Sequence, residues 1–327
     1  MTTVSVILCS HNRAAHLKET LASLRTTDVP AGWTVEVLLV DNASTDDTPA
    51  VMRAFEHPQA AVRVLQEKNR GLSHARNCGV RAARGRVLLF TDDDVRLPDG
   101  WMEGMATPIL EGTADAVAGG VELSAASQRA WMTAHHRDLL ASTERIDPAC
   151  PERMVGANMA VSARVFEVVP GFDPALGPGR LGLGGETLFS LQLRAAGFQI
   201  ASAFEVAVRH CPEATRMSRE AWKEAAAQSG QAGAYRSYHW AHRHYALPVL
   251  LAGWLYQRCR LGWYQGVQAL WGGPSSPMPT RELLLRRRVH RVRQHLREYG
   301  KPAKHDPHAL STKARRSPVL TPDAEAE

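Results

Sequence analysis

The chain has 327 residues, of which 44% are hydrophobic and 22% charged, a composition that excludes a fibrous or wholly disordered protein. Its net charge of +6 is matched by residues 281–301 alone, which hold eight Lys/Arg and two Asp/Glu. The rest of the chain is balanced, so we expect no nucleic-acid partner and no basic catalytic groove.

The beginning of the chain does not read as a signal peptide, because the apolar run at residues 4–9 is short and polar residues follow it at once. Five cysteines are scattered without the paired spacing of a zinc site or a disulfide framework. We therefore expect a cytoplasmic protein, at most one at the inner face of a membrane.

Short apolar runs alternate with segments of helical periodicity through the first 90 residues. Strands are predicted at residues 4–9, 35–40, 62–65 and 87–90, and helices at residues 16–24, 48–55 and 72–83. This alternation is typical of βαβ units, so the sequence predicts an α/β fold with a doubly wound, mostly parallel sheet.

Each predicted strand ends in polar residues. They are Ser10 and Asn12 after the first strand, Asp41 after the second, Asn69 after the third, and Asp92, Asp93 and Asp94 after the fourth. In open sheets of this type, ligands bind beyond the carboxyl ends of the strands. These side chains are therefore the candidate site.

The second half of the chain is less regular. A helix is predicted at residues 101–110 and a strand at 116–120. Residues 177–185 contain five glycines and a proline, and we interpret them as a mobile loop that leads into a helix at 186–195.

Toward the end of the chain, residues 246–271 form an amphipathic pattern with Leu255, Cys259, Trp263 and Leu270 on one face. Two interpretations stay open for this segment and the basic residues 281–301: a helical layer packed on the catalytic unit, or peripheral contact with anionic lipid. Residues after 301, rich in Pro, Ser, Ala and charge, are predicted to be disordered.

The run TDDDV at residues 91–95 is the strongest chemical signal. Adjacent carboxylates repel one another, and a divalent cation such as Mg²⁺ or Mn²⁺ would offset that repulsion and could also bind the phosphates of a nucleotide. A solvated acidic turn is the alternative for such a run by itself.

Four segments occur in a characteristic order: VSVILCSHNR, VEVLLVDNASTDDT, NRGLSHARNCG and GRVLLFTDDDV. Together they resemble the family 2 glycosyltransferases, which have the GT-A fold. Further similarity lies in GANMAVS at 156–162, GFDPAL at 171–176, GGETLFSLQLRAAGF at 184–198 and the late His210. The resemblance implies a GT-A domain at residues 1–215, a helical extension at 216–300 and a disordered tail at 301–327.

The same resemblance implies roles for the site residues. Ser10, Asn12, Asp41, Asn69, Arg76, Asp92 and Asp93 would bind the donor, with Arg76 close to its base. Asp94 would be the metal ligand, with Asp93 as the alternative, and His210 would complete the metal site.

Where the family usually has Glu-Asp before a helix, this chain reads Gly185-Glu186-Thr187. Glu186 stands at the position of the expected aspartate and is the candidate general base. A carboxylate that only stabilises the first turn of the helix is the alternative.

These features predict a metal-dependent, inverting glycosyltransferase. The donor would be a nucleoside-diphosphate sugar, and the acceptor a hydroxyl on a glycan, a lipid-linked sugar or a small molecule. The alternatives are a non-catalytic protein that binds sugar nucleotides or glycans, and a nucleotidyltransferase, although residues 10–13 contain no glycine for a phosphate loop.

Overall fold

The computed structural model describes residues 2–271 and 276–306. Within them, eight strands form one mixed sheet with the order β3-β2-β1-β4-β7-β6-β8-β5. The strands are β1 Val4–Ser10, β2 Val35–Asp41, β3 Ala61–Gln66, β4 Val87–Thr91, β5 Val95–Arg96, β6 Ala116–Leu123, β7 Asn158–Ser162 and β8 Ile200–His210. The first four are parallel, as predicted.

The second half of the chain makes the sheet mixed. Strand β7 runs antiparallel to both β4 and β6, whereas β6 and β8 are parallel. The short β5 directly follows the aspartate run and pairs antiparallel with the end of β8.

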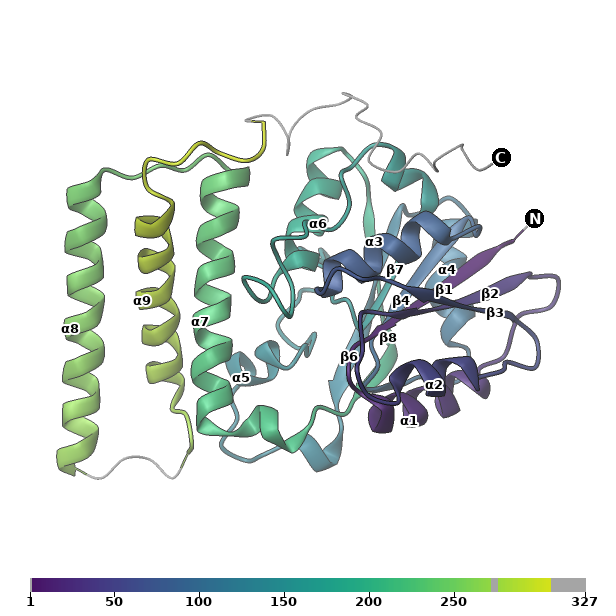
Figure 1. Ribbon diagram of the computed structural model, residues 1–327, viewed down its shortest axis with the longest axis horizontal. Helices are drawn as coiled ribbons and strands as arrows, with labels where there is room; N and C mark the ends of the chain where they lie inside the picture. Colours follow the sequence, from purple (N-terminus) through teal and green to yellow (C-terminus); the bar gives the residue numbers. More distant parts are fainter. Residues whose placement is uncertain (1, 272–275, 307–327) are drawn as a thin grey trace.

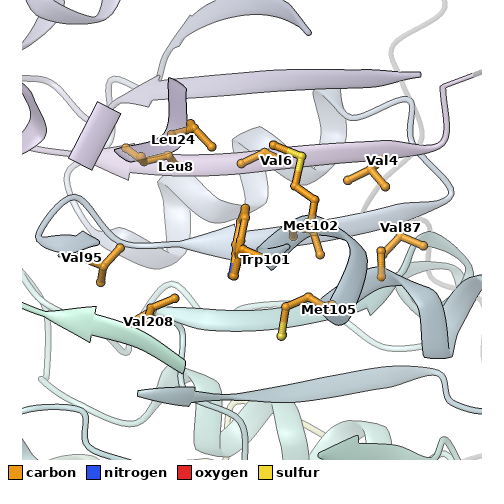
Figure 2. Packing of buried hydrophobic residues seen from close by; sticks show 14 of the residues in the cluster. Val4, Val6, Leu8, Leu24, Val87, Val95, Trp101, Met102, Met105 and Val208 are labelled. Carbon is orange, nitrogen blue, oxygen red and sulfur yellow. The ribbon is translucent and has the colours of Figure 1, made fainter. Parts of the chain in front are cut away.

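Helices cover both faces of the sheet, which confirms the doubly wound arrangement (Figure 1). One face is covered by helices α1 Ala14–Arg25, α2 Thr48–Arg53 and α4 Trp101–Leu110. The other face is covered by α3 Leu72–Ala82 and α6 Gly185–Ala195. Because side chains alternate along β1, Val6 and Leu8 point toward α4 and α1, whereas Ile7 and Cys9 point toward α3. Figure 2 shows the first of these layers around Trp101 and Met102.

Three C-terminal helices lie side by side, with α9 between α7 and α8 and with α7 nearest the sheet (Figure 1). They are α7 Arg219–Tyr235, α8 Leu247–Trp271 and α9 Thr280–Glu298. The backbones of α7 and α9 approach closely at Gly230, where a Cβ would lie 2.3 Å from the Arg287 carbonyl oxygen. These three helices confirm the predicted helical extension. The domain boundary after residue 215 stays a prediction.

Short helical segments complete the described chain. They are α5 Ala134–Leu139, the 3₁₀ turns Ala125–Ser127, Ala163–Glu167 and Ala214–Met217, and the π-helical turn Arg236–Trp240. None of the helices in residues 2–271 and 276–306 is both long and apolar enough to cross a membrane.

Asp173 joins the extension to the sheet domain. Its buried carboxylate accepts hydrogen bonds from Tyr235 Oη at 2.9 Å and Trp240 Nε1 at 2.8 Å, and it lies 3.3 Å from His305 Nε2. The ring of Trp240 also stacks on His305. His305 is therefore held against this aromatic site, while Lys301, Pro302, Lys304 and Asp306 are exposed, and the predicted disordered tail at 301–327 stays a prediction. Residues 307–327 lie outside the described residues.

We expect Asp173→Asn to lower the free energy of unfolding by about 2 to 4 kcal/mol, because an amide cannot satisfy all of these buried donors. Burial acts to raise the pKa of Asp173, but the hydrogen bonds outweigh it and hold that pKa at about 2. Because the folded pKa lies below the unfolded one, this stabilisation is present above about pH 4 and is lost as pH falls toward 2. Denaturant unfolding at pH 7 and pH 3 measures both effects. The exposed Asp28→Asn is the control, and an equal loss in both variants would contradict the anchoring role.

Candidate active site

A cavity of about 800 Å³ opens beyond the carboxyl ends of β1 and β4. It brings together six of the predicted site residues, which are Ser10, Asp92, Asp93, Asp94, Glu186 and His210. The glycine-rich segment forms part of its wall through Pro178, Gly179, Leu183 and Gly184. The predicted donor residues Asn12, Asp41, Asn69 and Arg76 lie outside this lining.

Pairing of β5 with β8 places His210 beside the aspartates. Val95 is opposite His210 in the sheet, and the Cys211 amide donates to the Asp94 carbonyl at 2.7 Å. As a result, His210 Nε2 lies 3.1 Å from Asp94 Oδ1. The other ring nitrogen, Nδ1, is 2.7 Å from the Leu140 carbonyl oxygen, to which it donates its proton. In the neutral ring, Nε2 is then free to bind a cation.

The three aspartates have different surroundings. Arg13 Nη1 lies 2.6 Å from Asp94 Oδ2 and 3.2 Å from Asp93 Oδ1, and Ser10 Oγ donates to Asp93 Oδ2 at 2.5 Å. Burial, with the charge of Asp94 beside it, raises the pKa of Asp93. Burial also acts to raise the pKa of Asp94, but His210 and Arg13 outweigh it and hold that pKa well below its usual range. Asp94 is thus the carboxylate best prepared to stay ionised.

The donor set fits a small divalent cation. In the described part of the chain, no three His, Cys, Asp or Glu side chains gather as a complete metal site. Mg²⁺ and Mn²⁺, however, are commonly held by one or two protein ligands together with substrate phosphates. Two neighbouring ligands of an octahedral ion lie about 3.0 Å apart, close to the 3.1 Å between Asp94 Oδ1 and His210 Nε2.

Arg76 connects the aspartate run to Glu186. Its buried guanidinium is 2.9 Å from Asp92 Oδ1 and 2.5 Å from Glu186 Oε1. Burial acts to raise the pKa of Glu186, but the charge and hydrogen bond of Arg76 outweigh it, so that pKa lies below its ordinary value. Glu186 is therefore held ionised, as a proton acceptor must be.

The glycosyl transferase family 2 model matches residues 5–165, which include β1 to β4, the aspartate run and β7. Residues 5–165 of the chain are a family 2 glycosyltransferase domain. Glu186 and His210, which share the cavity with the aspartates, follow the matched segment in the sequence.

Curated relatives of the chain agree with the family of this domain. Glycosyltransferase AglE of Haloferax volcanii is 28% identical over 207 residues, which are 62% of this chain and 65% of AglE. Succinoglycan biosynthesis protein ExoO of Rhizobium meliloti is 39% identical over 98 residues, or 29% of this chain and 27% of ExoO. The matches thus span less than two thirds of the length of these relatives.

Solved structures share the fold of this chain. Mannosyltransferase PcManGT from Pyrobaculum calidifontis, in complex with GDP-Man and Mn²⁺, has a TM-score of 0.59 at 21% identity, and the match covers 91% of this chain and 88% of PcManGT. S. aureus TarS 1-349 in complex with UDP-GlcNAc has a TM-score of 0.51 at 17% identity, with 90% and 89% covered. Both support a GT-A fold for this chain.

The remaining predicted donor residues are sequence neighbours of residues that line the cavity. Asp41 Oδ1 accepts from the Ser44 amide at 3.1 Å, and Asn12 Oδ1 accepts from the Thr45 amide at 2.7 Å. Asn69 is exposed. Donor binding by Asn12, Asp41, Asn69 and Arg76 stays a prediction.

Sequence reasoning missed two residues that shape the cavity beside the strand ends. Arg13 neutralises Asp93 and Asp94, and its only sequence signal was its place at the end of the first strand. Asn42 donates to the carbonyls of Glu67 and Asn69 and accepts from the Gly71 amide at 2.8 Å, so it fixes the turn before α3. Both roles depend on contacts between distant strand ends, which no local pattern shows.

Gly156 is the position where Arg76 and Glu186 approach the backbone. A Cβ there would lie 2.0 Å from Arg76 Nη2 and 2.7 Å from Glu186 Oε1. We expect Gly156→Ala to lower kcat/KM by about 100-fold, because even a displacement near 1 Å in an active site has this effect. Steady-state kinetics of glycosyl transfer measures it. Gly233→Ala is the matched control, since a Cβ at Gly233 meets nothing within 4 Å, and equal rates for the two variants would contradict the prediction.

Proposed function

We propose that this glycosyltransferase moves a sugar from a nucleoside-diphosphate donor to an acceptor hydroxyl, with inversion at the anomeric carbon and with Mg²⁺ or Mn²⁺ as cofactor. The observation that carries the proposal is one cavity that holds both the Asp94–His210 pair and an ionised Glu186. This chemistry favours glycosyl transfer over the nucleotidyltransferase and the non-catalytic alternatives.

In the proposed reaction, Glu186 accepts the proton of the acceptor hydroxyl, and the oxygen forms a bond to the anomeric carbon. The bond from that carbon to the diphosphate oxygen breaks on the opposite face, which inverts the centre. Arg76 positions Glu186, and Asp94 with His210 would hold the cation, with Asp93 as the alternative ligand. When bound, the cation stabilises the negative charge that develops on the diphosphate.

The donor side would be formed by Ser10, Asp92 and Asp93 in the cavity, with Asn12, Asp41 and Asn69 at its border. The segment at residues 177–185 would close over the donor and exclude water. Gly177 and Gly182, both at positive φ, are joined by a backbone hydrogen bond of 2.7 Å, so this wall of the cavity is a compact turn.

The direct test is a panel of UDP-, GDP- and dTDP-sugars, assayed for binding and for hydrolysis with Mn²⁺, with Mg²⁺ and with EDTA. We expect one donor to bind and turn over only with metal. Metal-independent turnover would remove the cofactor assignment, and no interaction with any donor would overturn the proposed function.

We also propose peripheral contact of the C-terminal helices with anionic lipid at the inner face of a membrane. One side of α8 packs on α9 through Leu261 and Tyr264. The opposite side leaves Leu255 59%, Trp263 63% and Leu270 83% exposed. Exposed arginines of α9, including Arg288 and Arg293, add the positive charge that attracts an anionic surface.

We expect Trp263→Asp to weaken binding to phosphatidylglycerol-containing vesicles by about tenfold, because Trp stabilises interfacial insertion and Asp is repelled by anionic lipid. Vesicle co-sedimentation measures the effect, and pure phosphatidylcholine vesicles test the role of charge. Leu191→Asp, which changes an exposed leucine of α6, is the control. Equal binding of the two variants would contradict the lipid contact.

A further inference from the structure

Among the arginines that line the cavity, the proposed reaction assigns no role to Arg145, Arg153, Arg236 or Arg287. Arg145 and Arg153 come from the segment between α5 and β7, Arg236 follows α7, and Arg287 lies on α9. They reach one cavity from three separate parts of the chain, so the packing of the C-terminal helices on the sheet domain creates this group.

Two of these arginines, Arg153 and Arg236, lie toward Glu186 rather than toward Asp94. The arginines beside Asp94 are Arg13 and Arg216, at 2.6 Å and 3.7 Å from its Oδ2. Arg76 and Arg153 lower the pKa of Glu186. Arg236 Nη1 also donates to the Gly184 carbonyl at 3.3 Å, two residues before Glu186. The cavity thus has one positive region for a diphosphate and a second beside the proposed base.

In the second positive region, two of the four arginines have no carboxylate partner among the described residues. Arg153 pairs with Asp138, and Arg145 contacts His135. In the described residues, neither Arg236 nor Arg287 has a carboxylate at ion-pair distance. The other carboxylates of this wall, Glu152 and Glu224, are exposed, and Glu224 accepts from Gln228 instead.

Neighbouring arginines lower the pKa values of Arg236 and Arg287. Burial, together with the charges of Arg287 and Arg291, lowers the pKa of Arg236 to about 10. Burial and the neighbouring Arg291, Arg145 and Arg153 also lower the pKa of Arg287, although Asp138 opposes them. An anion bound between Arg236 and Arg287 would relieve this repulsion.

We propose that Arg236 and Arg287 bind an oxyanion of the acceptor, a phosphate or a carboxylate, while the acceptor hydroxyl faces Glu186. This inference rests on the proposed function and adds the class of acceptor to it. The guanidinium fork matches either oxyanion through paired, charge-assisted hydrogen bonds. A neutral acceptor would leave both arginines without a partner.

The test compares acceptor probes that differ only in charge. Calorimetry measures binding of glucose 6-phosphate, glucuronate and glucose with Mn²⁺ and saturating UDP or GDP, so that the probe's phosphate does not occupy the Asp94 region. We expect at least one anionic probe to bind about tenfold more tightly than glucose. Arg236→Gln and Arg287→Gln should each remove that preference, and Arg236→Lys should restore part of it.

Arg53→Gln is the matched control, because Arg53 is an exposed arginine of α2 that does not line the cavity and lies outside the proposed lipid surface. The protein could bind phosphatidylinositol vesicles more tightly than glucose 6-phosphate and lose this binding in Arg236→Gln and Arg287→Gln. That result would assign the oxyanion to a lipid headgroup. Tighter binding of glucose 6-phosphate would assign the oxyanion to a soluble phosphate. Equal affinity for charged and neutral probes, no detectable binding of an anionic probe, or a preference that survives both substitutions overturns the inference. Failure of UDP and GDP to bind in the same titrations would instead overturn the proposed function.

Discussion

Glu186→Gln is expected to lower kcat for glycosyl transfer by about 10³-fold while the donor still binds, because a positioned general base contributes about 10² to 10⁴-fold. The amide keeps the size of the side chain but cannot accept the hydroxyl proton. Since Arg76 lowers the pKa of Glu186, the base is already ionised at neutral pH. We therefore expect no loss of rate from protonation of Glu186 between pH 6 and 8, and a decline only as pH falls below about 4.

Rates of nucleoside diphosphate release, with donor affinity measured separately, distinguish a catalytic from a structural role. Glu152→Gln is the matched control, because Glu152 is an exposed carboxylate on the same cavity wall. If Glu186→Gln retained full kcat, Glu186 would be only a partner for Arg76 and a first-turn carboxylate of α6. A fall in melting temperature with an unchanged kcat would point to the same conclusion.

Asp94→Asn is expected to weaken Mn²⁺ binding in the presence of nucleoside diphosphate by about 10 to 100-fold and to lower transfer by at least about 100-fold. The physical reason is the loss of the carboxylate that lies 3.1 Å from His210 Nε2 and stays ionised when buried. Titration of Mn²⁺ by calorimetry, followed by rate measurements across Mn²⁺ concentrations, separates weaker metal binding from slower chemistry.

Two further variants make this result specific. Asp93→Asn tests the alternative ligand, and the larger loss of Mn²⁺ affinity identifies the main one. Asp99→Asn removes an exposed carboxylate that follows β5 in the sequence and should change neither the Mn²⁺ affinity nor the rate of transfer. An unaltered Mn²⁺ affinity in both Asp94→Asn and Asp93→Asn would exclude the aspartate run as the metal site.

The first half of the fold could be predicted from the sequence because its signals are local. Each of the first four strands is a short apolar run, and the expected helices lie between them. The order β4-β7-β6-β8-β5 could not be predicted, since it depends on antiparallel pairing between strands separated by up to about 115 residues and on β5, which has only two residues. A strand of two residues has no periodicity to detect.

Some residues of the candidate site could likewise be predicted from the sequence, and others could not. Asp92, Asp93 and Asp94 follow a strand, and Glu186 begins a helix, so pattern and resemblance located them. The bridge from Arg76 to both Asp92 and Glu186 could not be predicted, because it joins α3, the end of β4 and α6. The same holds for Asp173, whose partners Tyr235, Trp240 and His305 come from the extension and the residues that follow it.

The pairing of β5 with β8 also bears on how the protein forms during synthesis. Residues 95–96 leave the ribosome more than 100 residues before residues 209–210, with which they pair. Contacts at such sequence separation form slowly, since a long loop must first be closed. We therefore expect nascent chains that stop at residue 165 to contain the parallel half of the sheet without any metal affinity, and chains that extend beyond residue 210 to acquire it. The ability to bind metal would thus report that the whole sheet has closed.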